Sequence, residues 1–327
     1  MRLTRQDAFA LLMAAGITAR ADGSSLKIDS GETATFLRQL TYIITRTFDR
    51  KYPDLKARSF IPVNHEIPAG AESFVWRSWD WAGTARIIDN FADDLPMIDV
   101  IAGEVAQKIK SLGDAYQFDI QSMRAAAMAG TQLDQKRAAA VRRAMENAVE
   151  VIAARGNTAA GLPGFINNPN VPLLTPPGQI NGSWLSATAE EILADLHTGA
   201  NTMVETTLEA FKPDTLLLPT NRYSLVATKP VSSLTPNVTI LKSFLETSPY
   251  IRNVDQWSYL NTADEAGTGP RAIYYGRSPE NVELFIPSEF EQLPPQWRNL
   301  AAVIACHMRI AGVVWYYPIA GEYVDGI

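Results

Sequence analysis

The order of predicted helices and strands along this chain predicts a protein of the α+β class. Helical and strand-like patterns occur in separate runs, and they neither alternate as in βαβ proteins nor repeat one element type. A long amphipathic helix lies near the middle, and apolar, β-branched strands dominate the last third. With 327 residues, 46% of them hydrophobic and 20% charged, the chain has enough apolar material for two subdomains around a large core.

The first sixty residues differ in charge from the rest of the chain. They hold ten Lys+Arg and six Asp+Glu, a net charge of +4, whereas the whole chain carries −6. Their pattern predicts a short helix over 1–16, an extended arm over 17–35 and a second helix over 35–50. An acidic chain is unsuited to wrapping DNA over its whole surface. A basic arm is compatible with self-association, with an inner surface facing nucleic acid, or with a solvated terminus.

Residues 59–95 are expected to form a long β-hairpin. Pro62 and Pro68 exclude a helix in the first half, PAGAES predicts a turn, and large side chains then alternate between two faces. A hairpin with apolar groups on both faces needs a covering surface, either from its own core or from a neighbouring subunit. Stacking of single-stranded nucleic acid is less favoured, because Asp80 lies among the tryptophans. The candidates for a subunit contact are Phe74, Trp76, Arg77, Trp79 and Trp81.

The long central helix is predicted over residues 131–155. Apolar residues recur at helical spacing from Val141 to Ile152, and Arg155 followed by Gly156 is a typical helix end. Residues 99–116 are read as strands or irregular structure, and 119–130 as a short Ala-rich helix that precedes the long one. A sharp bend, GLPGFINNPNVP, follows directly after the long helix.

The remaining chain mixes short helices and strands. A capped helix is predicted over 186–207, because Ser186 or Thr188 precedes Glu190 and Glu191. We expect strands over 215–219, 251–259, 272–276 and 282–287, helices over 221–228 and 238–246, and two strands over 300–317 that are separated at Gly312.

No motif with an evident chemistry is found. The three histidines lie far apart, the single Cys306 lies in an apolar run, and no phosphate-loop or GxSxG pattern occurs. We therefore expect no catalytic, cofactor-binding or metal-ligating residues. The absence of a signal peptide and of a long apolar run predicts a protein made in a cytosol, without a membrane span. A competing hypothesis is an enzyme whose site joins distant residues such as His197 and Asp195.

The sequence of elements resembles the major capsid proteins of tailed phages and prophages with the HK97-type fold, in the group that is also similar to encapsulin and linocin-like shells. The most specific stretch is GLPGFINNPNVP after the long helix, and LLLPTNRY and AVIACHMRIAGVVWYYPIAG add to it. The resemblance covers the chain from about residue 35 to the end. It implies a structural protein that assembles with copies of itself, and not an enzyme.

The resemblance also implies a division of the chain and a set of partners. Residues 1–58 would be an N-terminal arm and helix, 59–94 the extended loop, 95–161 with 296–327 the peripheral domain carrying the spine helix, and 162–295 the axial domain. Hexamers and pentamers would form an icosahedral head around double-stranded DNA, contacted non-specifically, in a virion assembled in the host bacterial cytoplasm. Separate scaffolding, portal and decoration proteins are possible partners, and an encapsulin-like compartment with enzyme cargo is the alternative.

Some members of that family crosslink a lysine of the extended loop to an asparagine. This chain has no lysine between Lys56 and Lys108, so no such crosslink is expected from its loop. Noncovalent contacts would then hold the shell together.

Overall fold

The computed structural model describes residues 52–82, 99–129, 133–175, 183–232, 237–264, 267 and 269–327. The chain divides into two compact units, Met1–Pro53 and Asp54–Ile327. The helices expected over 1–16 and 35–50 lie outside the described residues, so the fold is that of the second unit. It contains both helices and strands, and most of its strand pairs are antiparallel, which confirms the α+β class.

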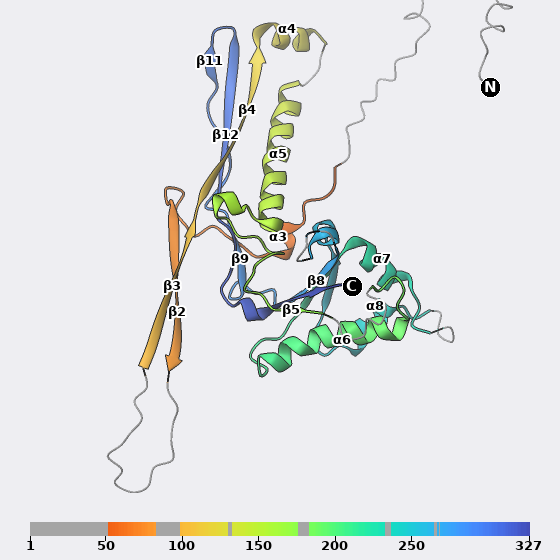
Figure 1. The fold of residues 1–327 in the computed structure, drawn as a ribbon. Helices are drawn as coiled ribbons and strands as arrows, with labels where there is room; N and C mark the ends of the chain where they lie inside the picture. Colours follow the sequence, from red (N-terminus) through yellow and green to blue (C-terminus); the bar gives the residue numbers. More distant parts are fainter. Residues whose placement is uncertain are drawn as a thin grey trace, which may run out of the picture. The chain divides into compact units, whose positions relative to one another are not determined.

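A long antiparallel sheet forms one layer of this unit. Strand β12 is its centre: β4 pairs with it over ten residues, from Asp119 opposite Ala301 to Lys110 opposite Ile310, and β10 and β11 pair with it as well. Figure 1 shows β11, β12 and β4 side by side, with α4 at the end where β4 finishes. The elements are β4 (Lys110–Asp119), α4 (Ile120–Ala129), β10 (Ser288–Gln292), β11 (Gln296–Arg298) and β12 (Ala301–Ile310).

The predicted break at Gly312 is confirmed. Strand β12 ends at Ile310, and β13 (Gly312–Trp315) leaves in another direction to pair with β9 (Val282–Phe285). Gly312 has φ +81°, and a Cβ there would lie 2.6 Å from the carbonyl oxygen of Pro163. Only glycine therefore fits this turn without displacing the backbone of the bend. Strand β1 (Val63–Asn64) completes this small sheet by pairing parallel to β9.

Helix α5 (Leu133–Arg155) packs against the long sheet, and it confirms the helix predicted over 131–155. Its apolar stripe, Val141, Met145, Val149 and Ile152, is buried in what we call the first core, around α5, the long sheet and the bend. The helix ends at Gly156, whose φ of +71° is the left-handed conformation that commonly terminates helices. The following bend then folds back, because Phe165 N–H donates to the Ala153 carbonyl and Ile166 N–H to that of Ala154.

A second sheet of five strands has the order β5-β14-β8-β6-β7. Its central strands are buried on both faces, and their residues alternate between two cores. Leu217, Ile273 and Tyr275 belong to the first core, whereas Leu216, Ala272 and Tyr274 belong to the second core, beneath the helices. The strands are β5 (Leu173–Leu174), β6 (Thr215–Leu218), β7 (Asn253–Gln256), β8 (Arg271–Tyr275) and β14 (Gly321–Asp325).

Three helices lie beside this second sheet, as Figure 1 shows. The predicted capped helix is confirmed as α6, whose N-cap Thr188 forms a reciprocal capping box with Glu191. The backbone N–H of Glu191 binds the Thr188 hydroxyl at 3.3 Å, and the Glu191 carboxylate accepts from Thr188 N–H at 2.7 Å. The helices are α6 (Ala189–Thr206), α7 (Thr220–Thr228) and α8 (Ile240–Thr247).

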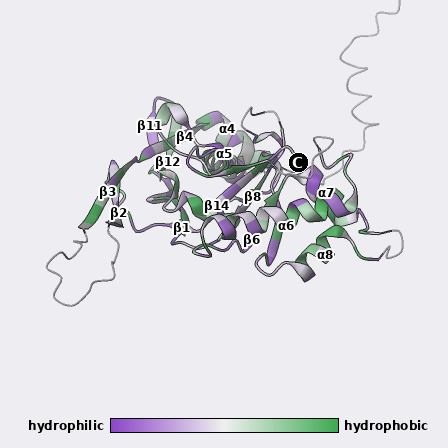
Figure 2. Ribbon diagram, turned by 60° about the horizontal axis from the view of Figure 1, so that its bottom comes forward, coloured by the Kyte–Doolittle hydropathy of each residue, from purple (hydrophilic) through white to green (hydrophobic). Residues whose placement is uncertain are grey.

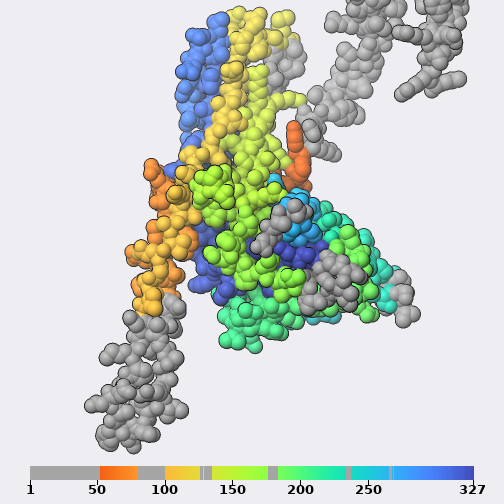
Figure 3. Space-filling view, in the orientation of Figure 1, coloured from red at the N-terminus to blue at the C-terminus, as the bar shows by residue number. Residues whose placement is uncertain are grey.

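A two-stranded hairpin extends from the body formed by the other three sheets (Figures 1 and 3). Strand β2 (Ser73–Ala82) pairs antiparallel with β3 (Asp99–Lys108), and no other described strand pairs with β2. The prediction that residues 59–95 contain the whole hairpin is wrong for its second strand, which is β3. Residues Val63 and Asn64 are not available as a partner for β2, because they pair with β9. Strand β2 pairs instead with β3, which follows it in the chain.

Candidate subunit interface

The root of the hairpin is held by aromatic contacts within the chain. Phe74 and Trp76 lie on one face of β2, where the Phe74 ring is 4.6 Å from that of Phe285 and the Trp76 ring is 5.9 Å from that of Tyr316. The Trp76–Tyr316 pair is edge-to-face at 89°, an arrangement favourable for aromatic rings. This face of the hairpin root is therefore covered by the chain's own residues.

The opposite face of β2 has no such cover. Val75 is 54% exposed and Trp79 63% exposed, and between them Arg77 Nε donates to Glu104 Oε1 of β3 at 2.7 Å. Both partners of this ion pair are mostly exposed, so it contributes at most about 1 kcal/mol. Figure 2 shows that the hydrophobic colouring continues onto the hairpin. A two-stranded hairpin is barely stable on its own, and this one exposes apolar side chains as well.

Strand β3 adds to the exposed apolar surface. Its large exposed side chains are Val100, Ile101 and Val105. By their register with β2, Ile101 and Val105 share the face of Trp76, whereas Val100 shares the face of Trp79. Isolated exposed apolar residues are ordinary, whereas several on one projecting element are typical of a contact surface. These residues are aliphatic, and they were not among the predicted contact residues, which were chosen mainly for their aromatic side chains.

The structure divides the five predicted contact residues into two groups. Phe74 and Trp76 lie against their own chain, whereas Arg77 and Trp79 face solvent. Trp81 belongs to β2, but its side chain lies outside the described residues. The assignment of all five to a subunit contact stays a prediction.

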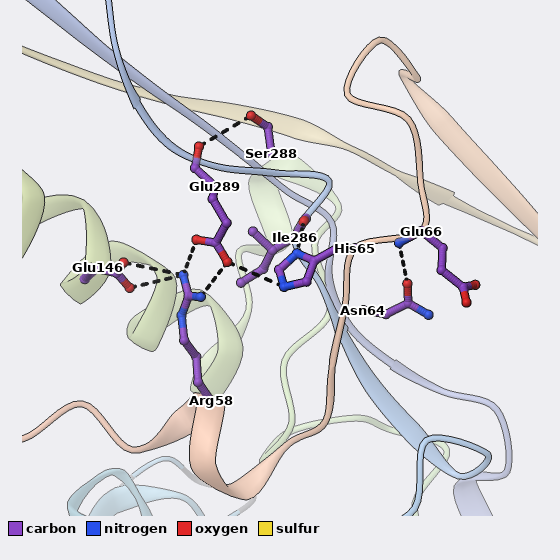
Figure 4. Close-up of polar contacts among 8 residues, drawn as sticks. All are labelled: Arg58, Asn64, His65, Glu66, Glu146, Ile286, Ser288 and Glu289. Carbon is purple, nitrogen blue, oxygen red and sulfur yellow. Dashed lines mark hydrogen bonds and ion pairs between the residues drawn. The ribbon is translucent and has the colours of Figure 1, made fainter.

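Three charged side chains fix the segment that leads into the hairpin (Figure 4). Arg58, on α3 (Ala57–Phe60), binds both carboxylate oxygens of Glu289 on β10, at 2.7 and 3.0 Å, and it lies 3.2 Å from Glu146 on α5. The hydrogen bond that Arg58 donates to Glu289 raises the pKa of Arg58 and lowers the pKa of Glu289. His65 also takes part, with Nδ1 2.8 Å from the Ile286 carbonyl oxygen.

A buried carboxylate supports the same segment from α5. Glu150 is 3% exposed, and its oxygens accept hydrogen bonds from the backbone N–H groups of Lys56 and Ala57, at 3.1 and 2.8 Å. Its Oε1 also accepts from Trp257 Nε1 at 2.9 Å. These N–H groups open α3, so Glu150 satisfies donors that have no partner within the helix. With Glu146 one turn earlier, α5 fixes the direction in which the chain enters the hairpin.

A second exposed apolar group lies at the far end of the long sheet. Trp297 of β11 is 63% exposed and Leu300 70%, and Leu300 stands in the tight turn between β11 and β12, beside Asn299 with φ +54°. The carbonyl of Leu300 accepts from Ile120 N–H, which joins this turn to the start of α4. Met123 and Met128 of α4 are exposed as well. The sequence does contain Trp297 and Leu300 around this turn, in QWRNLA, but they were not predicted as contact residues.

The described residues show no arrangement typical of catalysis. No group of three or more His, Cys, Asp or Glu side chains within them is suited to hold a metal ion. Asp195 accepts a hydrogen bond from Trp184 Nε1 at 3.1 Å, whereas His197 Nε2 contacts Thr247 Oγ1 at 3.0 Å. The two residues are two positions apart on α6, a spacing at which side chains do not face each other. None of the helices in the part of the chain that the structure describes is long and apolar enough to span a membrane.

The fold matches those of several solved phage capsid structures. The capsid of Myoviridae phage XM1 is similar with a TM-score of 0.78 and 14% identity, over 89% of this chain and 98% of that one. Mycobacterium phage Ogopogo gives 0.59 and 13%, over 90% and 98%, and Gordonia phage Cozz gives 0.58 and 13%, over 94% and 98%. The fold is thus the HK97-like fold of phage capsid proteins.

A family model identifies the chain more directly. The model of the major capsid protein family matches residues 83–327, and the chain belongs to this family. It is therefore a structural subunit that assembles with copies of itself into the shell of a virion. No match was found among curated proteins.

Proposed function

We propose that this protein forms the icosahedral head of a tailed bacteriophage, as hexamers and pentamers that enclose double-stranded DNA. One observation carries the contact that we assign to it: no described residue of the chain covers the face of β2 with Val75, Arg77 and Trp79. An exposed apolar hairpin favours aggregation of a free monomer, whereas in a symmetric assembly a neighbouring subunit can cover it. Aromatic residues and arginine are the side chains that most often anchor such contacts.

In this assignment the extended loop comprises both strands of the hairpin, residues 73–108, because β2 and β3 pair throughout. Helix α5 is the spine, the long sheet belongs to the peripheral domain, and the five-stranded sheet with α6, α7 and α8 belongs to the axial domain. The exposed group around Trp297 and Leu300 supplies a further contact at the end of the peripheral domain.

The charge of the chain supports a location for the contact with DNA. Residues 1–60 carry +4 and the whole chain −6, so we assign any non-specific contact with packaged DNA to the basic N-terminal part. Assembly would take place in the cytoplasm of the host bacterium, with separate scaffolding, portal and decoration proteins.

Electron microscopy and size-exclusion chromatography of the purified protein test the contact. We expect wild-type protein to form closed shells and Trp79→Ala to remain as small, folded species, because Trp79 has no described partner to lose within its own chain. Trp76→Ala is a less specific probe, since it also removes the Tyr316 contact. Normal shells from Trp79→Ala would count against the hairpin contact, and particles filled with protein instead of DNA in infected cells would favour an encapsulin-like compartment.

A further inference from the structure

The backbone of the hairpin shows which of its hydrogen-bonding groups are already used. Ile109 N–H donates to the Glu72 carbonyl at 2.9 Å, and these two residues continue the register in which Ser73 lies opposite Lys108. In an antiparallel ladder, bonded pairs alternate with non-bonded ones. The pairs at Phe74–Gln107, Trp76–Val105 and Ser78–Gly103 are therefore the bonded ones.

The odd-numbered residues of β2 consequently point their backbone groups away from β3. Val75, Arg77 and Trp79 each present an N–H and a C=O to the outer edge of the strand, and none of these groups has a partner among the described residues. Figure 3 shows the hairpin, in orange, projecting from the body of the same unit beyond its root. The outer edge of β2 is thus an open template for another strand.

This edge also lacks most of the features that usually prevent strand pairing. Proteins protect exposed edges with charged side chains, especially lysine, and with proline, a bulge or a very short strand. Strand β2 carries two charged residues, Arg77 and Asp80, and Arg77 is paired with Glu104 of the neighbouring strand. Strand β2, SFVWRSWDWA, is ten residues long, contains neither proline nor lysine, and keeps a regular register with β3 throughout. An unprotected edge beside exposed Val75 and Trp79 calls for a partner that covers both the backbone and the side chains.

We propose that the outer edge of β2 receives an extended segment of a second copy of this chain, which adds to the hairpin as a third strand. The inference rests on the proposed function and specifies how the hairpin contact forms. A strand of the second copy would bind to the backbone of β2, with apolar side chains packed beside it. A second copy is the occupant because the protein belongs to a family whose members form shells from many copies. Backbone bonds also suit a repeated contact, since they tolerate differences in side-chain surroundings between positions in a shell.

The outer edge of β3 is a poorer template. Its outward carbonyl at Lys108 already accepts a hydrogen bond from Gln107 Nε2 at 3.4 Å, and the Lys108 side chain lies beside Gly161. Val100, also on that edge, has further interactions of its own. The two edges of the hairpin are therefore not equivalent, and the experiment addresses β2.

Proline substitution separates the outward groups from the inward ones. Val75→Pro removes an outward N–H only, which an edge strand tolerates, whereas Ser78→Pro removes an inward N–H and breaks the pairing with β3. We expect Val75→Pro subunits to keep the unfolding midpoint of the wild type and to form no shells. Val75→Ala is the matched control, because it loses the same side chain and keeps the N–H, and we expect it to form shells.

Hydrogen exchange gives a readout that does not depend on a variant. Exchange is carried out on shells or on free subunits, quenched, and measured residue by residue by NMR after disassembly. We expect the N–H groups of Val75, Arg77 and Trp79 to exchange slowly in shells only, and those of Trp76 and Ser78 to be protected in both states.

The outcomes separate this inference from the proposed function. Normal shells from Val75→Pro, or fast exchange of the outward N–H groups in shells, would overturn strand addition. If Trp79→Ala still prevents assembly in that case, the hairpin remains a contact through its side chains alone. If Val75→Pro and Trp79→Ala both give normal shells, the hairpin contact itself is wrong.

Discussion

The hairpin and the five-stranded sheet use similar residues in opposite ways. In the central strands β6 and β8, every residue is buried, and the two faces supply two separate cores. In the hairpin, Val75, Trp79 and Ile101 are between 54% and 63% exposed, although they are as apolar as the residues of the sheet. The difference lies in what covers the strands. The sheet is complete within one chain, whereas the hairpin has cover only at its root.

This contrast predicts that changes in the two regions affect different measurements. Burial of apolar surface within the chain contributes to the stability of the free subunit, whereas apolar surface covered only in a shell contributes to assembly. Substitutions in the sheet and at the bend should lower the free energy of unfolding. Substitutions on the outer face of the hairpin should leave that free energy nearly unchanged and affect the yield of shells.

The largest effect is expected from Phe165→Ala at the bend. Phe165 is fully buried, its ring stacks on Trp315 with 5.0 Å between centroids, and it also contacts Tyr275. Truncation should cost about 3–5 kcal/mol, because it opens a cavity where the bend meets the first core. Urea denaturation of the unassembled subunit measures this loss. A cost below about 1 kcal/mol would show that the bend is not part of the core.

Glu150→Ala should have the next largest effect. It leaves two backbone N–H groups at the start of α3 and the Trp257 indole N–H without their acceptor. Unsatisfied buried donors cost about 1–3 kcal/mol each, partly recovered if water enters, so we expect a loss of about 3 kcal/mol. Glu146→Ala on the same helix is the control. Its ion pair with Arg58 is partly exposed, and a similar loss there would contradict the special role of Glu150.

The buried carboxyl group of Glu322, in β14, should make the free energy of unfolding of the subunit depend on pH. It is 4% exposed, its Oε2 has no hydrogen-bond partner in the described part of the chain, and burial raises its pKa from 4.5 to about 8. The folded protein therefore keeps a proton that the unfolded chain releases, so the free energy of unfolding falls as pH rises from about 4.5 to 8. Glu322→Gln should reduce this slope and stabilise the subunit at pH 8, as measured by denaturation at several pH values. An unchanged slope would show that Glu322 is not the group responsible.

The smallest effect on the free subunit is expected from Trp79→Ala. Because its side chain is mostly exposed and far from the cores, the free energy of unfolding should change by no more than about 0.5 kcal/mol. Differential scanning calorimetry of unassembled protein checks this value. A loss comparable to that of Phe165→Ala would mean that the hairpin is folded against its own chain, and the comparison between the two regions would fail.

Local signals predicted most of the elements correctly. The stripe from Val141 to Ile152 gave α5, the capping residues Thr188 and Glu191 gave α6, and Gly312 gave the break between β12 and β13. Each of these depends on residues that are close in the sequence. The short strands β1, β5, β10, β11 and β14 were not predicted, because two to five residues carry too little periodicity and gain their structure from a distant partner.

The candidate interface was predicted in part. The alternation in Ser73–Trp81 identified a strand with two apolar faces, but it did not reveal which face the body of the protein would cover. That depends on Phe285 and Tyr316, more than 200 residues away, which meet Phe74 and Trp76 only in the folded chain. The apolar turn at Leu300 was missed because its exposure is decided by the end of a sheet whose strands are far apart in the sequence.

The sequence by itself determined the class of this protein, its central helix, its caps and its glycine turns, because these follow from the preferences of neighbouring residues. Only the tertiary structure decided that β2 pairs with β3 and that Trp79 faces outward while Trp76 faces inward. It also decided that the backbone groups along one edge of the hairpin have no partner among the described residues. The physical reason is that burial and strand pairing are properties of surfaces brought together over long distances in the chain, and a strand pattern is the same whether its cover comes from within or from a neighbour.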